Sequence, residues 1–381
     1  MKLSWDIFCT VIDNYGDIGV AWRLARQLAH ERGQTVRLWV DDLCSFAHLA
    51  PGLDPGAEAQ TVRGIGIRRW HETASAGAGA ADVVIAAFGC RLPEDYLAAM
   101  AARARAPVWL NLEYLSAEDW VASCHGQASP HPRLPLTQHF YFPGFGPGCG
   151  GLLAEAGLLE RVARWQANPR LQQAWWERLG VPARRDDEIR ISVFCYPNPA
   201  LPAWLEHLAA GPRPCRLLVP QGKALPGIVA ALGGGELAPG QNRRRGALSV
   251  HCLPFTDQNA YDRLLWSCDI NLVRGEDSFV RAQWAMRPFL WHIYPQDEDA
   301  HMLKLDAFLS HYGAGLPADR RAALNGASHA WNRGEGLAEV WDAWVEADAA
   351  NLAHAQGWAR HCLADGDLAG RMVQFVEKRI Q

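Results

Sequence analysis

The chain has 381 residues, of which 49% are hydrophobic and 20% are charged, and its formal net charge is -4. This length exceeds what a single hydrophobic core usually supports, so we expect two domains. The slightly acidic balance offers no basic face for nucleic acid. Neither a signal peptide nor an apolar run long enough to cross a membrane is visible, and we expect a cytoplasmic protein.

The first predicted strand, residues 3–12, is apolar and rich enough in β-branched residues to be buried, and residues 21–30 follow it with helical spacing of apolar side chains. The loop between them contains Asp13 and Asp17. Open α/β sheets bind ligands at the carboxyl ends of their strands, so we expect an active site here. The alternative is that Asp17 caps the helix and Asp13 is a turn residue. Spacing alone does not separate the two interpretations.

Short apolar strands continue to alternate with helices, which is typical of a doubly wound parallel sheet. A Pro/Gly-rich stretch at 130–151 and a helical stretch at 152–179 follow, and a charged turn suggests a domain boundary near 180–188. We therefore predict a first Rossmann-like domain at 1–182. The strands expected in it are 3–12, 35–40, 65–70, 82–88 and 107–112.

The second half repeats the same alternation, so we predict a second Rossmann-like domain at 188–359. The last helix, within residues 360–381, is amphipathic and is expected to pack back onto the first domain. The strands expected in the second domain are 189–195, 215–219, 248–253, 270–273 and 289–293.

Two unusual residue types have plain interpretations. The ten cysteines are scattered without zinc-ligand spacing, and several fall inside apolar strands. The seventeen tryptophans could be platforms for sugars or bases, but most of those in helical patterns are expected to fill the core. These helical tryptophans are Trp22, Trp165, Trp175, Trp176, Trp204, Trp341 and Trp344.

The glycines Gly146, Gly148 and Gly151 fit the dinucleotide fingerprint by their spacing. Their context argues against it, because the fingerprint belongs in the turn after the first strand, whereas these glycines follow several strands and enclose Pro147. We interpret them as a loop between domains that needs special backbone angles. An NAD-dependent oxidoreductase remains the alternative enzyme class.

A second loop with chemical potential follows the strand at 270–273. Here Asp277 or Ser278 could cap a helix whose free amides face the carboxyl edge of the sheet, and Arg274 and Arg281 lie close in sequence. This end of the sheet would suit a diphosphate. The plain alternative is a capped helix with surface arginines. Two doubly wound domains with two such loops describe a GT-B glycosyltransferase, a class that usually needs no metal.

Several blocks in the same order resemble the EarP family, bacterial protein-arginine rhamnosyltransferases that modify elongation factor P. They span the chain, and they are long enough to be specific. The blocks are Ile-Asp-Asn-Tyr-Gly-Asp-Ile-Gly-Val at 12–20, Trp-Arg-Leu-Ala-Arg at 22–26, Asn-Leu-Glu-Tyr-Leu-Ser-Ala-Glu at 111–118, Arg-Gly-Glu-Asp-Ser-Phe-Val-Arg-Ala-Gln at 274–283 and Trp-His-Ile-Tyr-Pro-Gln-Asp-Glu at 291–298.

The resemblance implies that rhamnose is moved from dTDP-β-L-rhamnose to an arginine of elongation factor P, with inversion and without a metal or other cofactor. Asp17 resembles the general base of the family, and Asp13 its companion carboxylate. The remaining positions that match the family are implied to bind the donor. They are Asn14, Tyr15, Gly16, Phe194, Tyr196, Phe255, Gln258, Arg274, Glu276, Asp277 and Ser278.

Two departures qualify this assignment. The segment after Phe255 differs from the usual variants, which weakens the match at Gln258, and Tyr15 stands where Phe is sometimes found, so its hydroxyl has no essential role. A free arginine has a pKa above about 12, so an aspartate cannot deprotonate it in the ground state. We therefore expect Asp17 and Asp13 to hold the guanidinium while proton transfer accompanies attack. A non-catalytic module that binds elongation factor P is the second alternative.

Overall fold

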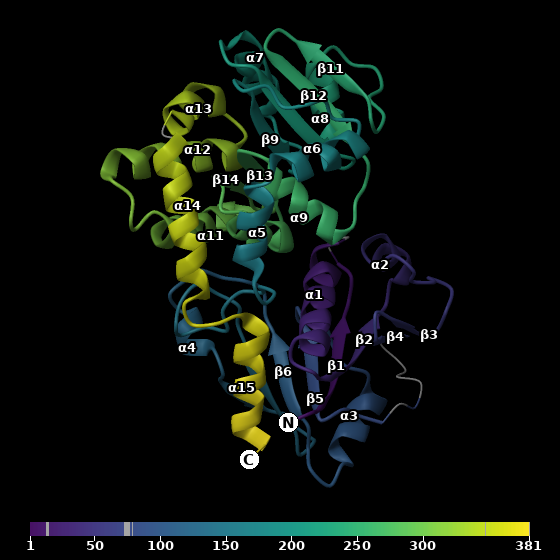
Figure 1. Cartoon of the computed structure of the whole chain (residues 1–381). Coiled ribbons are helices and arrows are strands. Elements are labelled where there is room, and N and C mark those ends of the chain that lie inside the picture. Colours follow the sequence, from purple (N-terminus) through teal and green to yellow (C-terminus); the bar gives the residue numbers. More distant parts are fainter. Residues whose placement is uncertain (13–14, 72–76, 78, 347, 381) are drawn as a thin grey trace. The chain divides into compact units, whose positions relative to one another are not determined.

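The structure, a computed structural model, describes residues 1–12, 15–71, 77, 79–346 and 348–380. Contacts between residues divide the chain into two compact units, one made of 1–156 with 362–381 and one made of 157–361. Figure 1 shows that each unit has its own sheet with helices packed on it. The predicted architecture of two Rossmann-like α/β domains is confirmed.

The sheet of the first unit has the strand order β3-β4-β2-β1-β5-β6-β8-β7, and only the edge pairs β3/β4 and β7/β8 are antiparallel. The central strands are fully or largely buried, as their mainly apolar sequences predict, although β1 contains an aspartate and β6 an asparagine. The elements are β1 (Ser4–Cys9), α1 (Gly16–His30), β2 (Thr35–Val40), α2 (Leu43–Leu49), β3 (Ala59–Val62), β4 (Ile65–Arg69), β5 (Val83–Ala87), α3 (Glu94–Ala101), β6 (Val108–Leu112), α4 (Val121–Cys124), β7 (Ala128–Pro130), β8 (Thr137–Tyr141) and α15 (Leu368–Ile380).

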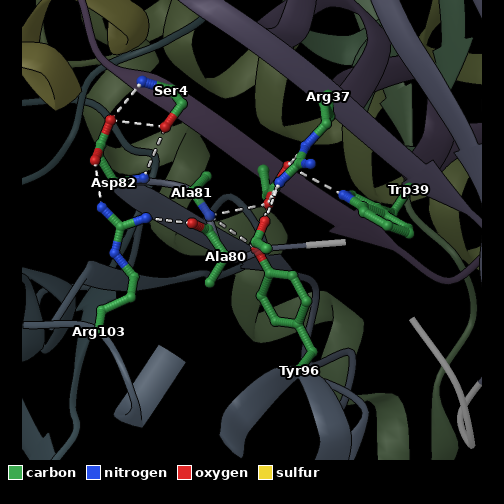
Figure 2. A network of polar contacts seen from close by, with 10 residues as sticks. Ser4, Arg37, Trp39, Ala80, Ala81, Asp82, Tyr96 and Arg103 are labelled. Atoms are coloured by element: carbon green, nitrogen blue, oxygen red, sulfur yellow. Dashed lines mark hydrogen bonds and ion pairs between the residues drawn. The ribbon is translucent and has the colours of Figure 1, made fainter. Parts of the chain in front are cut away.

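A buried carboxylate fixes β1 against its neighbours in the first sheet, and Figure 2 labels its partners Arg37, Trp39 and Tyr96. Asp6 is fully buried in β1, and its two oxygens accept hydrogen bonds at 2.6 Å from Nε and Nη2 of Arg37 in β2. The indole of Trp39 and the hydroxyl of Tyr96 also donate to Asp6. Burial and the Asp6 carboxylate raise the pKa of the Tyr96 phenol. Because a buried charge is tolerated only with such partners, this network holds β1 and β2 in one register.

The Pro/Gly-rich stretch, expected as a loop between domains, belongs to the first unit and contains β8. A Cβ added to Gly148 would lie 2.8 Å from Cβ of Ala122, and one added to Gly150 would lie 2.4 Å from Tyr141. Of the three fingerprint glycines, only Gly151 has a positive φ, at 77°. Close packing within the unit therefore accounts for Gly148, and backbone conformation accounts for Gly151.

The C-terminal helix α15 completes the first unit, as predicted. Leu368, Ala369, Met372 and Val376 lie in the same core cluster as β1 and α1. At the start of this helix the carboxylate of Asp367 accepts a hydrogen bond at 2.9 Å from Nε2 of Gln27 in α1. Residues more than 300 positions apart in sequence therefore share one core.

The second unit has the strand order β11-β12-β10-β9-β13-β14, parallel except for the edge strand β11. Its elements are α5 (Leu158–Gln166), α6 (Pro169–Arg178), β9 (Ile189–Val193), α7 (Leu201–Ala210), β10 (Cys215–Pro220), α8 (Leu225–Ala231), β11 (Asn242–Arg245), β12 (Leu248–Leu253), α9 (Gln258–Ser267), β13 (Ile270–Arg274), α10 (Glu276–Trp284), β14 (Phe289–His292), α11 (Ala300–Tyr312), α12 (Ala318–Arg333), α13 (Leu337–Val345) and most of α14 (Asp348–Leu363).

The contact division between the units lies at 156/157, whereas the sequence predicted a boundary between 182 and 188. The difference in the boundary comes from α5 and α6, which the sequence prediction places in the first domain and the contacts place in the second unit. The side-chain amide of Gln166 in α5 donates to the carbonyls of Trp266 and Ala285, at 3.2 and 2.8 Å, and the indole of Trp165 donates to Ser267. The polar side chains of α5 thus bind it to the second sheet and its helices.

The predictions for tryptophan and cysteine can be compared with burial. Six of the seven helical tryptophans are buried and Trp165 is partly buried, as expected for core residues. All ten cysteines are free thiols, and six of them are buried. Of the helices that the structure describes, none combines the length and the apolar composition that a bilayer crossing requires.

Candidate active site

The loop after β1 carries the first predicted carboxylate. Asp17 is buried in the first turn of α1, and its Oδ2 accepts a hydrogen bond at 3.2 Å from the amide of Ile12. Helix α1 begins at Gly16 after Tyr15, whose ring meets the imidazole of His48 edge to face at 5.8 Å. Asp13 and Asn14 lie outside the described residues. Asp17 therefore fastens the loop as well as presenting a carboxylate at the carboxyl edge of the sheet.

A second carboxylate, Asp41, lies beside this loop and was missed as a candidate. Its Oδ1 accepts hydrogen bonds from the amides of Val11, at 2.9 Å, and Asp42, at 2.8 Å. Strands β1 and β2 are parallel and pair Cys9 with Val40, so the loops after these residues start at the same level. The position of Asp41 directly after a neighbouring parallel strand was the available signal in the sequence.

The charges of Asp17 and Asp41 both affect the pKa of the buried thiol of Cys9. Burial raises the pKa of Cys9 well above its ordinary value, and the negative charges of Asp17 and Asp41 raise it further. The thiol is therefore uncharged and inert at neutral pH. Two carboxylates near one strand end create a negative electrostatic potential, which favours a cationic ligand such as a guanidinium.

The second unit contains a stack of two rings and one guanidinium at the carboxyl edge of its sheet. Phe194 and Tyr196 follow β9, and Arg274 ends the adjacent strand β13. The Cζ atom of Arg274 lies 4.6 Å from the centroid of each ring. Arg274 is largely buried, and its Nε has no hydrogen-bond partner among the described residues. A buried cation held by two rings is suited to an incoming anion.

The helix after this stack begins differently from the prediction. The N-cap of α10 is Gly275, with φ 65° and ψ -168°, rather than Asp277 or Ser278, which lie with Glu276 in the first turn. Gly275 can adopt this conformation because it has no Cβ. Its carbonyl accepts a hydrogen bond at 3.0 Å from the indole of Trp291. The first amides of α10 are at the same edge as Arg274, where they can bind an anion.

Arg281, which the sequence also offered for a diphosphate, has another function. It is buried in α10, and its Nε and Nη2 donate to the two oxygens of Asp262 in α9, at 3.0 and 2.7 Å. Asp262 is buried as well. The pair neutralises itself within the core, so Arg281 is not available to a ligand.

The other donor residues predicted in the second unit lie at the same edge of its sheet. Gln258 begins α9 and is buried, and its Nε2 donates to Oδ2 of Asp277 at 3.3 Å. Phe255 lies between β12 and α9 and is 39% exposed. Thus Gln258 and Asp277 are brought into contact, and Phe194, Tyr196 and Arg274 form one stack. The roles of all the predicted site residues stay predictions.

A buried histidine packs against the stack without adding charge to it. His292 at the end of β14 packs edge to face on Tyr196, with ring centroids 5.4 Å apart. Burial lowers its pKa to about 4, with smaller contributions from the charges of His301 and Arg274. His292 is therefore neutral at pH 7, and it adds no charge to the site. Among the described residues, no three His, Cys, Asp or Glu side chains gather closely enough to hold a metal ion.

Two Rossmann-like units with ligand-suited loops at the carboxyl ends of their strands define a GT-B glycosyltransferase fold. The fold is similar to that of a UDP-glucosyltransferase from Polygonum tinctorium, with a TM-score of 0.53 and 10% identity over 99% of this chain and 98% of the other. At this identity the likeness concerns the fold alone.

The particular family follows from closer relatives. The family model of the elongation factor P (EF-P) rhamnosyltransferase EarP matches residues 5–377. The chain is 52% identical over 384 aligned residues to the protein-arginine rhamnosyltransferase of Pseudomonas putida strain KT2440, and the match covers 100% of each. It is also 40% identical in sequence to the chain of a solved structure that concerns EarP-mediated arginine glycosylation of EF-P. The TM-score is 0.72, and the match covers 99% of each chain. The chain belongs to the EarP family of protein-arginine rhamnosyltransferases, and the predicted family and enzyme class are confirmed.

Proposed function

We propose that this chain transfers rhamnose from dTDP-β-L-rhamnose to the guanidinium of one arginine of elongation factor P, with inversion at the anomeric carbon. The observation that carries the proposal is the match to the EarP family over residues 5–377. The opposite charges of the two candidate ligand edges support it. Carboxylates lie at the edge proposed for the cationic arginine, and a cation lies at the edge proposed for the anionic donor.

The donor is proposed to bind to the second unit. The rings of Phe194 and Tyr196, with Phe255 and Gln258, are suited to the thymine and the sugar, and the first turn of α10 at Glu276, Asp277 and Ser278 is assigned to the ribose and diphosphate. The amides of this turn and the Arg274 guanidinium would stabilise the negative charge on the departing diphosphate. The proposal includes no metal or other cofactor.

The acceptor arginine is proposed to bind at the loop after β1. A guanidinium nitrogen attacks the anomeric carbon of rhamnose, and the bond between that carbon and the phosphate oxygen breaks, so dTDP leaves. The nitrogen loses a proton to Asp17 as its resonance is lost during attack, because an aspartate is too weak a base to remove it beforehand. Asp13 is proposed as the companion carboxylate, and Asn14, Tyr15 and Gly16 as donor contacts from the same loop.

A cytoplasmic location is part of the proposal, since the proposed acceptor is a translation factor. We propose no direct contact with nucleic acid. The family match sets aside the two alternatives that the sequence left open, an NAD-dependent oxidoreductase and a non-catalytic module that binds elongation factor P.

The deciding experiment is mass spectrometry of purified elongation factor P after incubation with the chain and dTDP-rhamnose. We expect one deoxyhexose on a single arginine-containing peptide, and no addition when either the donor or the chain is omitted. The anomeric configuration of the product, measured by NMR, tests inversion. Unmodified factor under conditions where the chain is folded and binds dTDP would contradict the proposed reaction.

A further inference from the structure

Lys223 lies beside the stack of Phe194, Tyr196 and Arg274 and belongs to the turn between β10 and α8. It follows β10, whose neighbours in the sheet are β9 and β12. Its Nζ lies 5.7 Å from the centroid of the Tyr196 ring, and Cζ of Arg274 lies 4.6 Å from the same centroid. The preceding residue also approaches the stack, since a Cβ added to Gly222 would lie 3.9 Å from Cε2 of Phe194.

The ammonium group of Lys223 is available to a ligand. Lys223 is exposed, and no carboxylate in the described part of the chain pairs with it. Arg281 differs in this respect, because Asp262 already neutralises it inside the core. The sequence suggested Arg274 and Arg281 as the two cations for a diphosphate. The structure leaves Arg274 with that function and offers Lys223 in place of Arg281.

The electrostatics of this edge call for a second cation. Two acidic residues, Glu276 and Asp277, lie in the first turn of α10, next to Arg274. The amides at a helix N-terminus supply only about half a positive charge. The leaving diphosphate gains further negative charge when its bond to the sugar breaks, so one guanidinium and one helix end leave it poorly compensated.

We infer that Lys223 binds the diphosphate of the donor and supplies this second positive charge. The inference rests on the proposed function, because it takes a nucleoside diphosphate sugar as the ligand. Lys223 has a flexible stem and a compact charge, so it can follow the diphosphate as charge develops, whereas the stacked Arg274 is fixed. The ring of Tyr196 directs the ammonium toward this edge when no ligand is bound.

The test is isothermal titration calorimetry with dTDP, dTMP and thymidine as probes. For Lys223→Ala we expect about five- to tenfold weaker binding of dTDP, a smaller loss for dTMP and no change for thymidine, since only the phosphates meet the ammonium. Lys223→Arg keeps the charge and should retain most of the affinity. The difference between wild type and Lys223→Ala should shrink at high ionic strength.

Arg213→Ala is the matched control. Arg213 is an exposed cation just before β10, at the opposite end of the same strand, about 20 Å away at the rise of a β-strand. We expect dTDP affinity to be unchanged in this variant. An equal loss in Arg213→Ala and Lys223→Ala would show a general charge effect and would overturn the inference.

Two other outcomes also contradict the inference, and both can be told apart from failure of the proposed function. Unchanged dTDP binding by Lys223→Ala would remove the residue from the donor site. An equal loss for dTDP and thymidine would mean that Lys223 only positions Tyr196. If the wild-type chain binds neither dTDP nor dTDP-rhamnose, the proposed function itself fails.

Discussion

The two sheet edges that are candidates for ligand binding carry charges of opposite sign, and different groups hold these charges in place. At the edge of the first sheet, backbone amides of the loop after β1 hold the carboxylates of Asp17 and Asp41. At the edge of the second sheet, aromatic faces hold the cation of Arg274. Amides are natural partners of carboxylates, and ring faces are natural partners of guanidinium groups. Both supports hold a charged group at the carboxyl end of its sheet, where a ligand of opposite sign can approach.

The largest effect is expected at the edge of the first sheet with Asp17 and Asp41, which we call the negative edge. Asp17→Asn keeps the shape of the side chain but removes its charge and its ability to accept a proton, so we expect turnover to fall by about two to four powers of ten. Rhamnosylation of elongation factor P, followed by mass spectrometry, measures this, and circular dichroism checks the fold. Near-normal turnover in a folded variant would exclude Asp17 as the base.

The edge of the second sheet with Arg274, which we call the positive edge, comes next. Substitutions there should weaken the binding of the donor rather than slow the proton transfer. Arg274→Ala removes a buried cation that lies over the rings of Phe194 and Tyr196. We expect dTDP to bind about ten- to a hundredfold more weakly in calorimetry. Arg274→Lys is the control for charge alone, and it should recover only part of the affinity because an ammonium lacks the planar fork of a guanidinium. Full recovery would show that the stack is unimportant.

Asp41 is expected to contribute to the negative charge and to the loop position at the negative edge. Asp41→Ala removes the acceptor for the amides of Val11 and Asp42, and we expect turnover to fall about tenfold while KM for the donor stays constant. Asp41→Asn retains an oxygen for these amides and separates position from charge.

The neighbour Asp42 provides the control for this prediction. Its Oδ1 accepts from the amide of Ser45 and caps α2. Asp42→Ala should cost about 1 kcal/mol of stability without lowering turnover. Equal turnover losses at positions 41 and 42 would assign both effects to the loop fold and not to Asp41.

The smallest expected effect concerns how the free energy of unfolding depends on pH through His292, which packs on Tyr196 at the positive edge. Burial lowers the pKa of His292 to about 4 from an ordinary value of 6.5, so between these values the unfolded chain binds a proton that the folded chain does not. Its contribution to stability is complete above pH 6.5 and is lost as the pH falls toward 4. At pH 5 the loss is about 2 kcal/mol.

His292→Phe should therefore reduce the difference in unfolding free energy between pH 7 and pH 5, measured by urea denaturation. The substitution keeps a planar ring and breaks no side-chain hydrogen bond of Nδ1 in the described part of the chain. An unaltered pH dependence in His292→Phe would show that this histidine is not the titrating group.

The central strands could be predicted from sequence because they are mainly apolar, as in β5, which is apolar throughout, and β10, which contains one arginine. The antiparallel edge strands β3, β7 and β11 and the edge-proximal β8 were missed, because they are short, partly exposed and polar. Asp17 and Arg274 were found from their places after strands and from the family resemblance.

Contacts between distant residues account for what the sequence did not predict. The pairing of Arg281 with Asp262 joins two helices, and no local pattern announces it. The place of Asp41 beside the loop at residues 11 and 12 depends on the register between β1 and β2, which the buried Asp6 network holds. The approach of Lys223 to Tyr196 likewise depends on the order of β10 and β9 in the sheet.

Helix α15 sets an order for folding during synthesis. Its residues Leu368, Met372 and Val376 complete a core whose other members come from the first strands and helices of the chain. The second unit, residues 157–361, is synthesised entirely before this helix. The ribosome therefore releases all of the second unit before the first unit can close its core. The first unit begins to be synthesised first but is completed last.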